Sequence, residues 1–309
     1  MSLVNALQAA HEVYTPVTDH GNPTQCCVLM LVQPLNFNIA DERPIEYGLW
    51  DKDIPCYRCE WQDVLERTTL NADRMLTYRL VGAAEVEWEV SVVYYRGGYD
   101  AAEYREQSRE TRLRLEMSRA IKCPDVLTHL AGMKAVQQAL GEIGVLERFL
   151  DEEKAARVRS TFMPMYKLDA SDAGQRARKV ATDPEQAKHY VLKPNLEGGG
   201  NNVYGSGIPD FLASVPKDQW HKYILMRLIE PPADIDGVLM TAERLHQGPV
   251  VSELGLLGTV LWRRRKENGG MEMIRNEAGG WTFKTKPTHV EEMSVVKGFG
   301  CFDCPRLTD

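Results

Sequence analysis

The sequence predicts an α/β half followed by an α+β half, and three observations lead to this division. Helix and strand signals alternate over the first ~100 residues, which is typical of layered α/β structure. The second half instead carries strand after strand with few helices, as an antiparallel sheet does. The chain has 309 residues, 43% of them hydrophobic and 26% charged, so it can bury a globular core. We place the boundary between the two domains near residue 125, which gives 1–125 and 126–309.

The α/β half begins with an amphipathic helix and continues with two strong strands. Leu3, Leu7 and Ala10 recur at helical spacing near the amino terminus. Residues 26–32 (CCVLMLV) are a continuous apolar run, typical of a buried parallel strand. Residues 86–95 first alternate with glutamates and then become apolar, which predicts a second strand. This layering indicates a small doubly wound domain.

Two helices and a series of strands are predicted after these elements. The charge-rich segment 103–119 predicts a helix with Leu113 and Met117 on one stripe. A second helical stretch runs from 130 to 150, and 151–188 indicate helix plus loop. The later strands are predicted at 189–194, 223–230, 249–264 with breaks at Gly255 and Gly258, 271–276 and 281–286.

The composition argues against several classes of protein. The net charge is −7, whereas nucleic-acid and anionic-membrane surfaces need clustered positive charge. No apolar segment reaches the roughly 18–20 residues of a membrane span, and the amino terminus lacks a secretory signal pattern. The seven cysteines are an odd number, which disfavours a closed disulfide framework. We therefore expect a cytoplasmic protein with reduced thiols.

Two C-x-x-C pairs, Cys56/Cys59 and Cys301/Cys304, raise the possibility of a zinc site. Such pairs bind zinc when they converge, but these two lie far apart in the sequence. The alternative is that the four side chains are small buried hydrophobic groups.

The segment from Lys193 to Asn202 (KPNLEGGGNN) is the most informative part of the sequence. Its three glycines, 198–200, leave backbone amides bare, and such amides can converge on an anion. Lys193 adds a positive charge just before the loop, and the Glu197 carboxylate is the kind of ligand that Mg²⁺ prefers. The pattern predicts phosphate binding; the alternative is a flexible hairpin turn.

Other segments supply the remaining parts of a nucleotide site. The strand from Tyr223 to Met226 offers an apolar slot for a purine ring, although it also fits a plain buried strand. Glu253 lies in an apolar run and needs a partner such as a ribose hydroxyl or a metal, unless it points to solvent. Lys134 and Lys286 would neutralise phosphate charge during transfer, or are surface lysines.

Six segments, read together, resemble eukaryotic glutathione synthetases, which are ATP-grasp ligases. The matching segments occur in the family's order and are VVYYRGGY (92–99), 122–138, 190–205, 223–231, 252–258 and FKTK (283–286). The resemblance implies a substrate-binding domain at 1–125 and an ATP-grasp domain at 126–309 that is incomplete at its amino end. It also implies a homodimer.

The resemblance also implies roles for individual residues. The catalytic residues would be Lys193 and Lys286, and Glu197 would bind Mg²⁺. The ATP-binding residues would be Lys134, Lys193, Glu197, Gly198, Gly199, Gly200, Asn201, Asn202, Tyr204, Met226, Arg227, Leu228, Ile229, Glu253 and Lys286. The substrate-binding residues would be Asn38, Arg96, Tyr99, Lys284, Val295 and Val296.

The implied reaction joins γ-glutamylcysteine to glycine, with ATP converted to ADP and phosphate. The cysteinyl carboxylate would take the γ-phosphoryl group, and the glycine amine would then displace phosphate from this acyl phosphate. Two alternatives remain open. One is a non-catalytic or weakly active relative that binds nucleotide or a thiol peptide, and the other is a ligase that uses another amino acceptor.

Four departures from the family's pattern favour these alternatives. The family extends upstream of Met1 with a Glu-x-Asn and a Ser-x-Ser motif, and neither occurs in this sequence, so we expect an amino-terminal part to be lacking. The glycine-rich lid reads MSVVKG at 293–298. Lys284 stands where arginine is usual, which loses a bidentate contact to carboxylate. Arg227 and Glu42 stand where an acid and a glutamine are usual.

Overall fold

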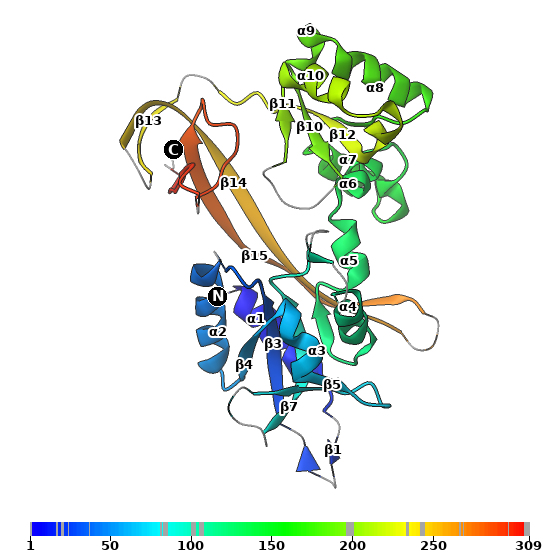
Figure 1. Ribbon diagram of the computed structural model, residues 1–309, viewed down its shortest axis with the longest axis vertical. Coiled ribbons are helices and arrows are strands. Elements are labelled where there is room, and N and C mark those ends of the chain that lie inside the picture. The colour runs from blue at the N-terminus through cyan, green and yellow to red at the C-terminus, as the bar shows by residue number, and fades with distance from the viewer. Residues whose placement is uncertain are drawn as a thin grey trace. The chain divides into compact units, whose positions relative to one another are not determined.

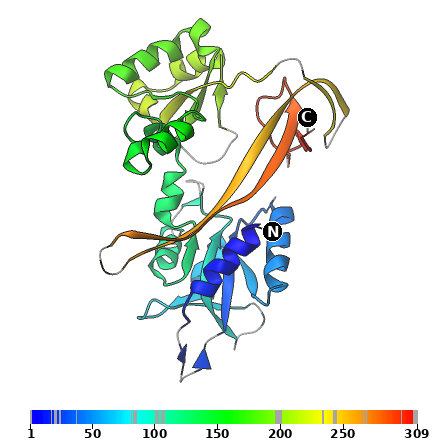
Figure 2. The ribbon, with the colours of Figure 1, turned by 180° about the vertical axis from the view of Figure 1, so that it is seen from behind.

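The computed structural model forms two compact units (Figures 1 and 2). It describes residues 2–16, 18–19, 22–23, 25–36, 38–80, 82, 86–99, 103–104, 108–195, 201–232, 235–241, 245–265, 267, 269–295 and 297–305. Unit 1 comprises Met1–Val126, Glu253–Phe283 and Cys304–Asp309, and unit 2 comprises Leu127–Ser252 and Lys284–Asp303. A domain boundary near residue 125 stays a prediction, because a segment of the second half belongs to unit 1.

Unit 1 is built on a mixed sheet in which the described strands run in the order β4-β3-β7-β6-β5, with β8 also paired to β7. Their bounds are β3 Cys26–Val32, β4 Cys56–Glu60, β5 Thr68–Leu70, β6 Leu76–Arg79, β7 Glu87–Tyr95 and β8 Ile121–Cys123. The pairs β3/β4, β3/β7 and β7/β8 are parallel, and β5/β6 and β6/β7 are antiparallel. A separate small ladder pairs β1 (Thr18–Asp19) with β2 (Asn22–Pro23). The predicted strands at 26–32 and 86–95 are confirmed.

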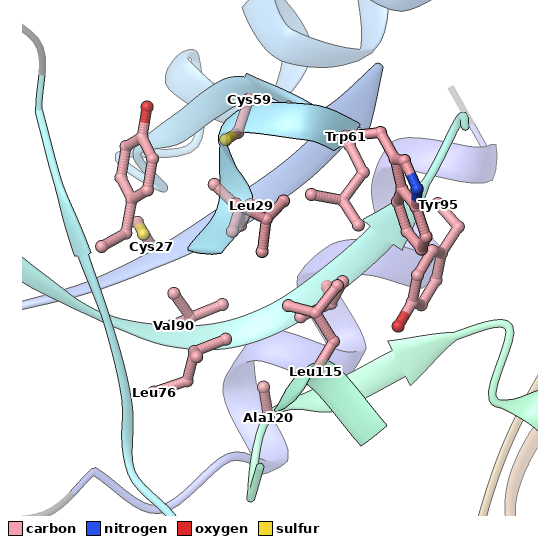
Figure 3. Close-up of a cluster of buried hydrophobic side chains, with 13 residues drawn as sticks. Cys27, Leu29, Cys59, Trp61, Leu76, Val90, Tyr95, Leu115 and Ala120 are labelled. Atoms are coloured by element: carbon pink, nitrogen blue, oxygen red, sulfur yellow. The ribbon is translucent and has the colours of Figure 1, made fainter. Parts of the chain in front are cut away.

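Helices cover both faces of this sheet, as the doubly wound prediction requires. On one face α1 (Ser2–Val13) and α2 (Ile39–Trp50) pack against alternate residues of β3, such as Met30. On the other face η1 (Trp61–Asp63), α3 (Val64–Arg67) and α4 (Ser108–Met117) pack against Leu29 and Val90 (Figure 3). Successive strand residues point to opposite faces, so the apolar run of β3 serves both cores.

The helix predicted within 103–119 is present as α4, but the stripe with Leu113 and Met117 is not its buried side. Leu113 and Met117 share a stripe but are 61% and 48% exposed, whereas Leu115 is fully buried. The buried side also carries Arg112, whose guanidinium lies 4.1 Å from the centre of the Tyr95 ring. A cation over an aromatic face is attracted to the ring, and this contact lets a charged residue take an inward position.

The continuous helix predicted at 130–150 is also wrong. The structure has α5 (Val126–Ala131), α6 (Lys134–Leu140) and η3 (Leu146–Arg148) instead. Met133 is extended with ψ at 148°, which separates α5 from α6. The helix α6 ends at Leu140, and Gly144 lies in the turn before η3 with φ at +84°, a conformation that glycine adopts without strain.

Unit 2 contains an antiparallel sheet in the order β11-β10-β12-β9. The strands are β9 Met165–Lys167, β10 Tyr190–Pro194, β11 Val203–Tyr204 and β12 Tyr223–Arg227. The helices of this unit are α7 Glu152–Arg159, α8 Asp172–Thr182, α9 Pro184–Ala187, α10 Gly207–Ser214 and η4 Lys217–Lys222. One face of the sheet, with Leu192 and Leu225, packs against α8 and α10. The predicted strands at 189–194 and 223–230 are confirmed, and β9 was not predicted.

A second antiparallel sheet has the order β13-β14-β15-β16 and contains two long strands. The strands are β13 Asp236–Met240, β14 Leu245–Arg264, β15 Met271–Pro287 and β16 Cys301–Phe302. The breaks predicted at Gly255 and Gly258 are wrong, because β14 runs through both. A Cβ at Gly255 would lie 2.6 Å from the Thr282 hydroxyl, so this glycine allows two paired strands to approach closely. The gap predicted between 276 and 281 is likewise absent.

All seven cysteines are free thiols in the structure. Cys56 and Cys59 are buried in β4 on opposite faces of the sheet, so they cannot both bind one metal ion. Burial raises the pKa of each of these two thiols to about 12, which keeps them protonated. Cys301 is half-buried and Cys304 exposed, so the buried interpretation is wrong for that pair. Among the described helices, none is long and apolar enough to cross a membrane.

The turn after β7 depends on glycine at position 98. Gly98 has φ at +78°, and a Cβ there would lie 2.6 Å from Cζ3 of the Trp61 ring. The ring belongs to the core and cannot move cheaply. Gly98 therefore fixes how Arg96 and Tyr99 leave the sheet.

We expect Gly98→Ala to lower the free energy of unfolding by about 2–4 kcal/mol, because backbone strain adds to a clash in the core. Gly82 is a matched control. It also has φ at +78°, but a Cβ there meets no described atom within 4 Å. Gly82→Ala should lose only about 1 kcal/mol. Urea unfolding of both variants measures the difference, and equal losses would contradict the role of the Trp61 contact.

Candidate functional site

The loops after β3 and β7 meet at the carboxyl edge of the unit 1 sheet. From β3 the chain crosses to β4 on one side, and β7 lies on the other side of β3. Such a change of direction opens a crevice beyond the strand ends, where α/β proteins bind ligands. Asn38 lies at the start of α2 just after β3, and Arg96 follows the last residue of β7. The fold thus brings these two predicted substrate residues to one place.

Hydrogen bonds within the β3 loop and an ion pair to the β7 loop meet at Glu42, whose side chain is fully buried. The Asn36 amide donates to Oε2 of Glu42 at 2.5 Å, and the backbone N–H of Asn38 donates to Oδ1 of Asn36 at 2.9 Å. Nε of Arg96 lies 3.8 Å from Oε1 of Glu42, and Nη2 of Arg96 lies 3.6 Å from Asp41. The Asn38 side chain makes no capping hydrogen bond to α2.

The sequence analysis missed Asn36 and treated Glu42 only as a departure from the family. The available signal was a short loop with two asparagines between a strand and a helix, where amide side chains bond to nearby backbone groups. Tyr99, the third predicted substrate residue of this unit, is 39% exposed beside the Gly98 turn. Burial raises the pKa of the neighbouring Tyr94, while the charge of Arg96 opposes that rise.

In unit 2 a hydrogen bond holds Lys134 near Lys193. The backbone N–H of Ala135 donates to Oδ1 of Asn195 at 2.9 Å, and the backbone N–H of Asn195 donates to the Lys222 carbonyl at 2.9 Å. The start of α6 is thereby tied to the end of β10. Burial lowers the pKa of Lys193, the positive charge of Lys134 lowers it further, and Glu292 opposes both effects. Two cations are thus held within electrostatic reach of each other, an arrangement that favours a bound polyanion.

Glu292 completes this cluster and was not predicted. Nδ2 of Asn202 donates to Oε1 of Glu292 at 2.5 Å, and the Tyr204 hydroxyl donates to the same oxygen at 3.4 Å. Burial raises the pKa of Tyr204, the hydrogen bond from Asn202 opposes this, and Glu292 reinforces it. The predicted residues Asn202, Tyr204 and Lys193 are therefore brought together, with Glu292 as the carboxylate among them. Asn201 lies at the exposed start of this segment.

A cavity of about 560 Å³ adjoins the face of the β11-β10-β12-β9 sheet that carries Lys193. Met226 of β12 lines it and pairs with Val191 of β10, so Lys193 stands about 7 Å further along the same face. The rest of the lining includes Gln138 of α6 and Phe162. The cavity has the size of a site for a small ligand such as a purine base, and its lining includes Glu142 and Arg159 but neither Lys134 nor Lys193.

The other residues predicted to form the adenine slot are less enclosed. Arg227 and Ile229 are exposed, and Leu228 is half-buried with its N–H bonded to the His189 carbonyl at 2.8 Å. Glu253 is exposed in the part of β14 that belongs to unit 1. Their roles in ATP binding stay predictions.

The strand β15 places Lys284 and Lys286 on one face and Thr285 on the other. The buried Thr285 hydroxyl donates to Asp303 at 2.9 Å and accepts from Ser252 at 2.8 Å. The Lys286 ammonium donates to the Val290 carbonyl. The hydrogen bonds of the buried Thr285 hydroxyl anchor the strand that presents both lysines.

The predicted lid residue Val295 lies in a tight turn, in which the N–H of Phe299 donates to the Ser294 carbonyl at 2.8 Å. Glu197, Gly198, Gly199, Gly200 and Val296 lie outside the described residues. Their roles in binding phosphate, Mg²⁺ and substrate stay predictions.

Comparison with known proteins decides the family. Residues 1–307 match the family model described as the ATP-binding domain of eukaryotic glutathione synthase. The chain belongs to the eukaryotic glutathione synthase family. The resemblance seen in the six sequence segments is thereby confirmed.

Individual members of the glutathione synthase family agree with this assignment. The chain is 36% identical over 311 residues to the glutathione synthetase large chain of Schizosaccharomyces pombe, which covers 99% of this chain and 60% of that protein. It is 36% identical over 281 residues to the Mus musculus glutathione synthetase, which covers 90% and 56%. The chain therefore spans about 60% or less of the length of these relatives.

A solved structure supports the fold. The glutathione synthetase-like effector of Globodera pallida, in its apo form, superposes with a TM-score of 0.67 at 18% sequence identity. The match covers 99% of this chain and 61% of that one. This likeness concerns the arrangement of elements alone.

We expect Lys193→Met to stabilise the unliganded protein. The lowered pKa means that the folded state disfavours the charged form, so the penalty is present at neutral pH and disappears as the pH rises above the ordinary value of lysine. Removing the charge should raise the free energy of unfolding by a few tenths to about 1 kcal/mol. Lys222→Met is the control, because Lys222 is exposed in the same unit. Urea unfolding at pH 7 measures both, and a loss of stability in Lys193→Met would contradict the cationic cluster.

Proposed function

We propose that the chain binds ATP in unit 2 and γ-glutamylcysteine in unit 1, and takes part in their ligation with glycine to form glutathione. The observation that carries this proposal is the placement of Lys134 beside a half-buried Lys193 whose pKa is lowered. The description of the matched family as ATP-binding and the names of the relatives give the nucleotide and the reaction.

The reaction requires stabilisation of charge and alignment of the reacting groups more than it requires acid–base groups. The cysteinyl carboxylate attacks the γ-phosphorus, the bond to the β-phosphate oxygen breaks, and ADP leaves. Lys134, Lys193 and Lys286 would stabilise the charge on the transferring phosphoryl group. The glycine amine then attacks the carbonyl carbon of the acyl phosphate, phosphate leaves and the amine loses a proton.

Mg²⁺ belongs to this proposal as the partner of the ATP phosphates, whose negative charge it would offset. Glu197, which follows Lys193 by four residues, would hold it. The carboxylate of Glu292, next to Asn202 and Tyr204, adds an oxygen ligand of the type that Mg²⁺ prefers. Among the described residues no group of three or more His, Cys, Asp or Glu side chains could hold a metal ion, so the Mg²⁺ site rests on Glu197 and Glu292 as proposed ligands.

A second candidate function is binding of nucleotide or thiol peptide without turnover. It is favoured by the substitutions in the strand and turn that face the substrate. Lys284 replaces the family's arginine and cannot form a fork to a carboxylate. Met293 and Ser294 stand where the family's lid has its two leading glycines, and Ser294 pairs with Phe299.

We further propose that the chain works as a homodimer in the cytoplasm. The family resemblance supports the dimer, and the seven free thiols suit a reducing compartment.

We expect ADP release that requires γ-glutamylcysteine and glycine together. Lys193→Met should lower this rate at least a hundredfold while Lys222→Met leaves it within twofold, because the lost charge acts on the transferring phosphoryl group. A coupled assay measures ADP, with serine or β-alanine in place of glycine as a test of acceptor choice. ATP binding in calorimetry without turnover would favour the second candidate, and binding of neither ATP nor γ-glutamylcysteine would contradict both.

A further inference from the structure

The Glu42 carboxylate and the Arg96 guanidinium face each other without completing a hydrogen bond. Oε1 of Glu42 and Nε of Arg96 lie 3.8 Å apart, and both are buried atoms that lack a hydrogen-bond partner. An acceptor and a donor of opposite charge that are both buried and unpaired favour pairing with each other. A small movement of the Arg96 side chain would satisfy both atoms at once.

The other oxygen of Glu42 is already committed. Asn36 must turn its oxygen toward the Asn38 N–H, since a backbone N–H can only donate. Its Nδ2 therefore donates to Oε2 of Glu42. Residue 42 is consequently faced by two donors, one on each oxygen, and a carboxylate is the side chain that accepts from both.

A glutamine at this position could accept from only one of the two donors. Its oxygen would turn to Asn36, whose orientation is fixed, and its NH₂ group would then face Nε of Arg96. Two donors pointing at each other repel, so the guanidinium would be pushed from the sheet edge. This makes the glutamate at position 42 a requirement of the Asn36 loop in this chain.

We propose that Glu42 is a positioning residue that docks the Nε edge of Arg96 and so presents its two terminal nitrogens to a substrate carboxylate. Arg96 is 27% exposed, which leaves part of the guanidinium open at the sheet edge. Through Asn36, the same carboxylate also fixes the loop that carries Asn38. Glu42 thus couples two residues expected to hold γ-glutamylcysteine, and this inference rests on the proposed function for the identity of that ligand.

The test exchanges the carboxylate and the amide between positions 42 and 36, which leaves the net charge of the double variant unchanged. Glu42→Gln should weaken binding of γ-glutamylcysteine about ten- to hundredfold, because Arg96 is displaced. Adding Asn36→Asp should restore binding to within about threefold. The introduced carboxylate would accept from both the Asn38 N–H and the NH₂ group of the introduced glutamine, which turns the glutamine oxygen back to Arg96. Asp51→Asn is the control, since Asp51 is exposed at the carboxyl end of α2, the end opposite Asn38, so binding should stay within about twofold.

Calorimetry on the full chain measures these affinities, with thermal melts to confirm folding. Tighter binding in Glu42→Gln would overturn the proposal, because it would mean that Glu42 acts on Arg96 only as an opposing charge. Unchanged binding would also overturn it. Failure of the swap to rescue would show that the hydrogen-bond pattern is not what positions Arg96.

A measurement on the unliganded protein distinguishes failure of this inference from failure of the proposed function. In ¹⁵N NMR spectra the Arg96 Nε–H signal, assigned with Arg96→Lys, should be protected from exchange in the wild type and the double variant, and lose protection in Glu42→Gln. If the signal follows this pattern but γ-glutamylcysteine does not bind the wild type, the ligand assignment fails and the positioning role stands. If the signal is the same in all three proteins, the positioning role is overturned whatever binds.

Discussion

The hydrogen bond from the Ala135 N–H to the Asn195 side chain joins the helix that carries Lys134 to the strand that carries Lys193. Without it, two ammonium groups would drift apart, since like charges repel and part of the Lys193 stem is buried. The fold therefore maintains an electrostatic arrangement that is unfavourable in the unliganded protein. Such an arrangement is explained by a ligand that brings several negative charges.

The carboxyl edge of unit 1 also holds a charged pair, but there the two charges are opposite in sign. There a buried carboxylate and a guanidinium stand near each other, and neither of the facing atoms has a partner. The parallel pair of β3 and β7 sets this geometry, because both loops leave the sheet at the same edge. Unit 1 thus keeps two charged atoms without a hydrogen bond at a point where the family is expected to hold a substrate.

Local sequence patterns predicted correctly those helices and strands whose formation depends on residues within the same segment. The strands at 26–32 and 86–95 were found because an apolar run or alternation is readable over a few positions. The buried side of α4 was not predicted, because the inward position of the Arg112 side chain depends on its contact with the Tyr95 ring. The unbroken course of β14 depends on how Gly255 meets Thr282 of the partner strand.

The residues of the candidate site likewise fall into those that the sequence predicted and those that it did not. Lys134, Lys193 and Tyr204 were recognisable from motifs, but Glu292 meets Asn202 from 90 positions away. Asn36 is close in sequence to its partners, yet its role follows from the orientation of its side-chain amide. This orientation is fixed because the backbone N–H of Asn38 can only donate to the amide oxygen. Contacts of this kind need coordinates.

The measurement that tests the central claim most directly is the pKa of the Lys193 ammonium, followed by NMR in the wild type and in Lys134→Met, with and without ATP. The account predicts a pKa below the ordinary lysine value in the unliganded wild type. It predicts a rise toward that value both when Lys134 is removed and when ATP binds. An ordinary pKa that responds to neither change would contradict it.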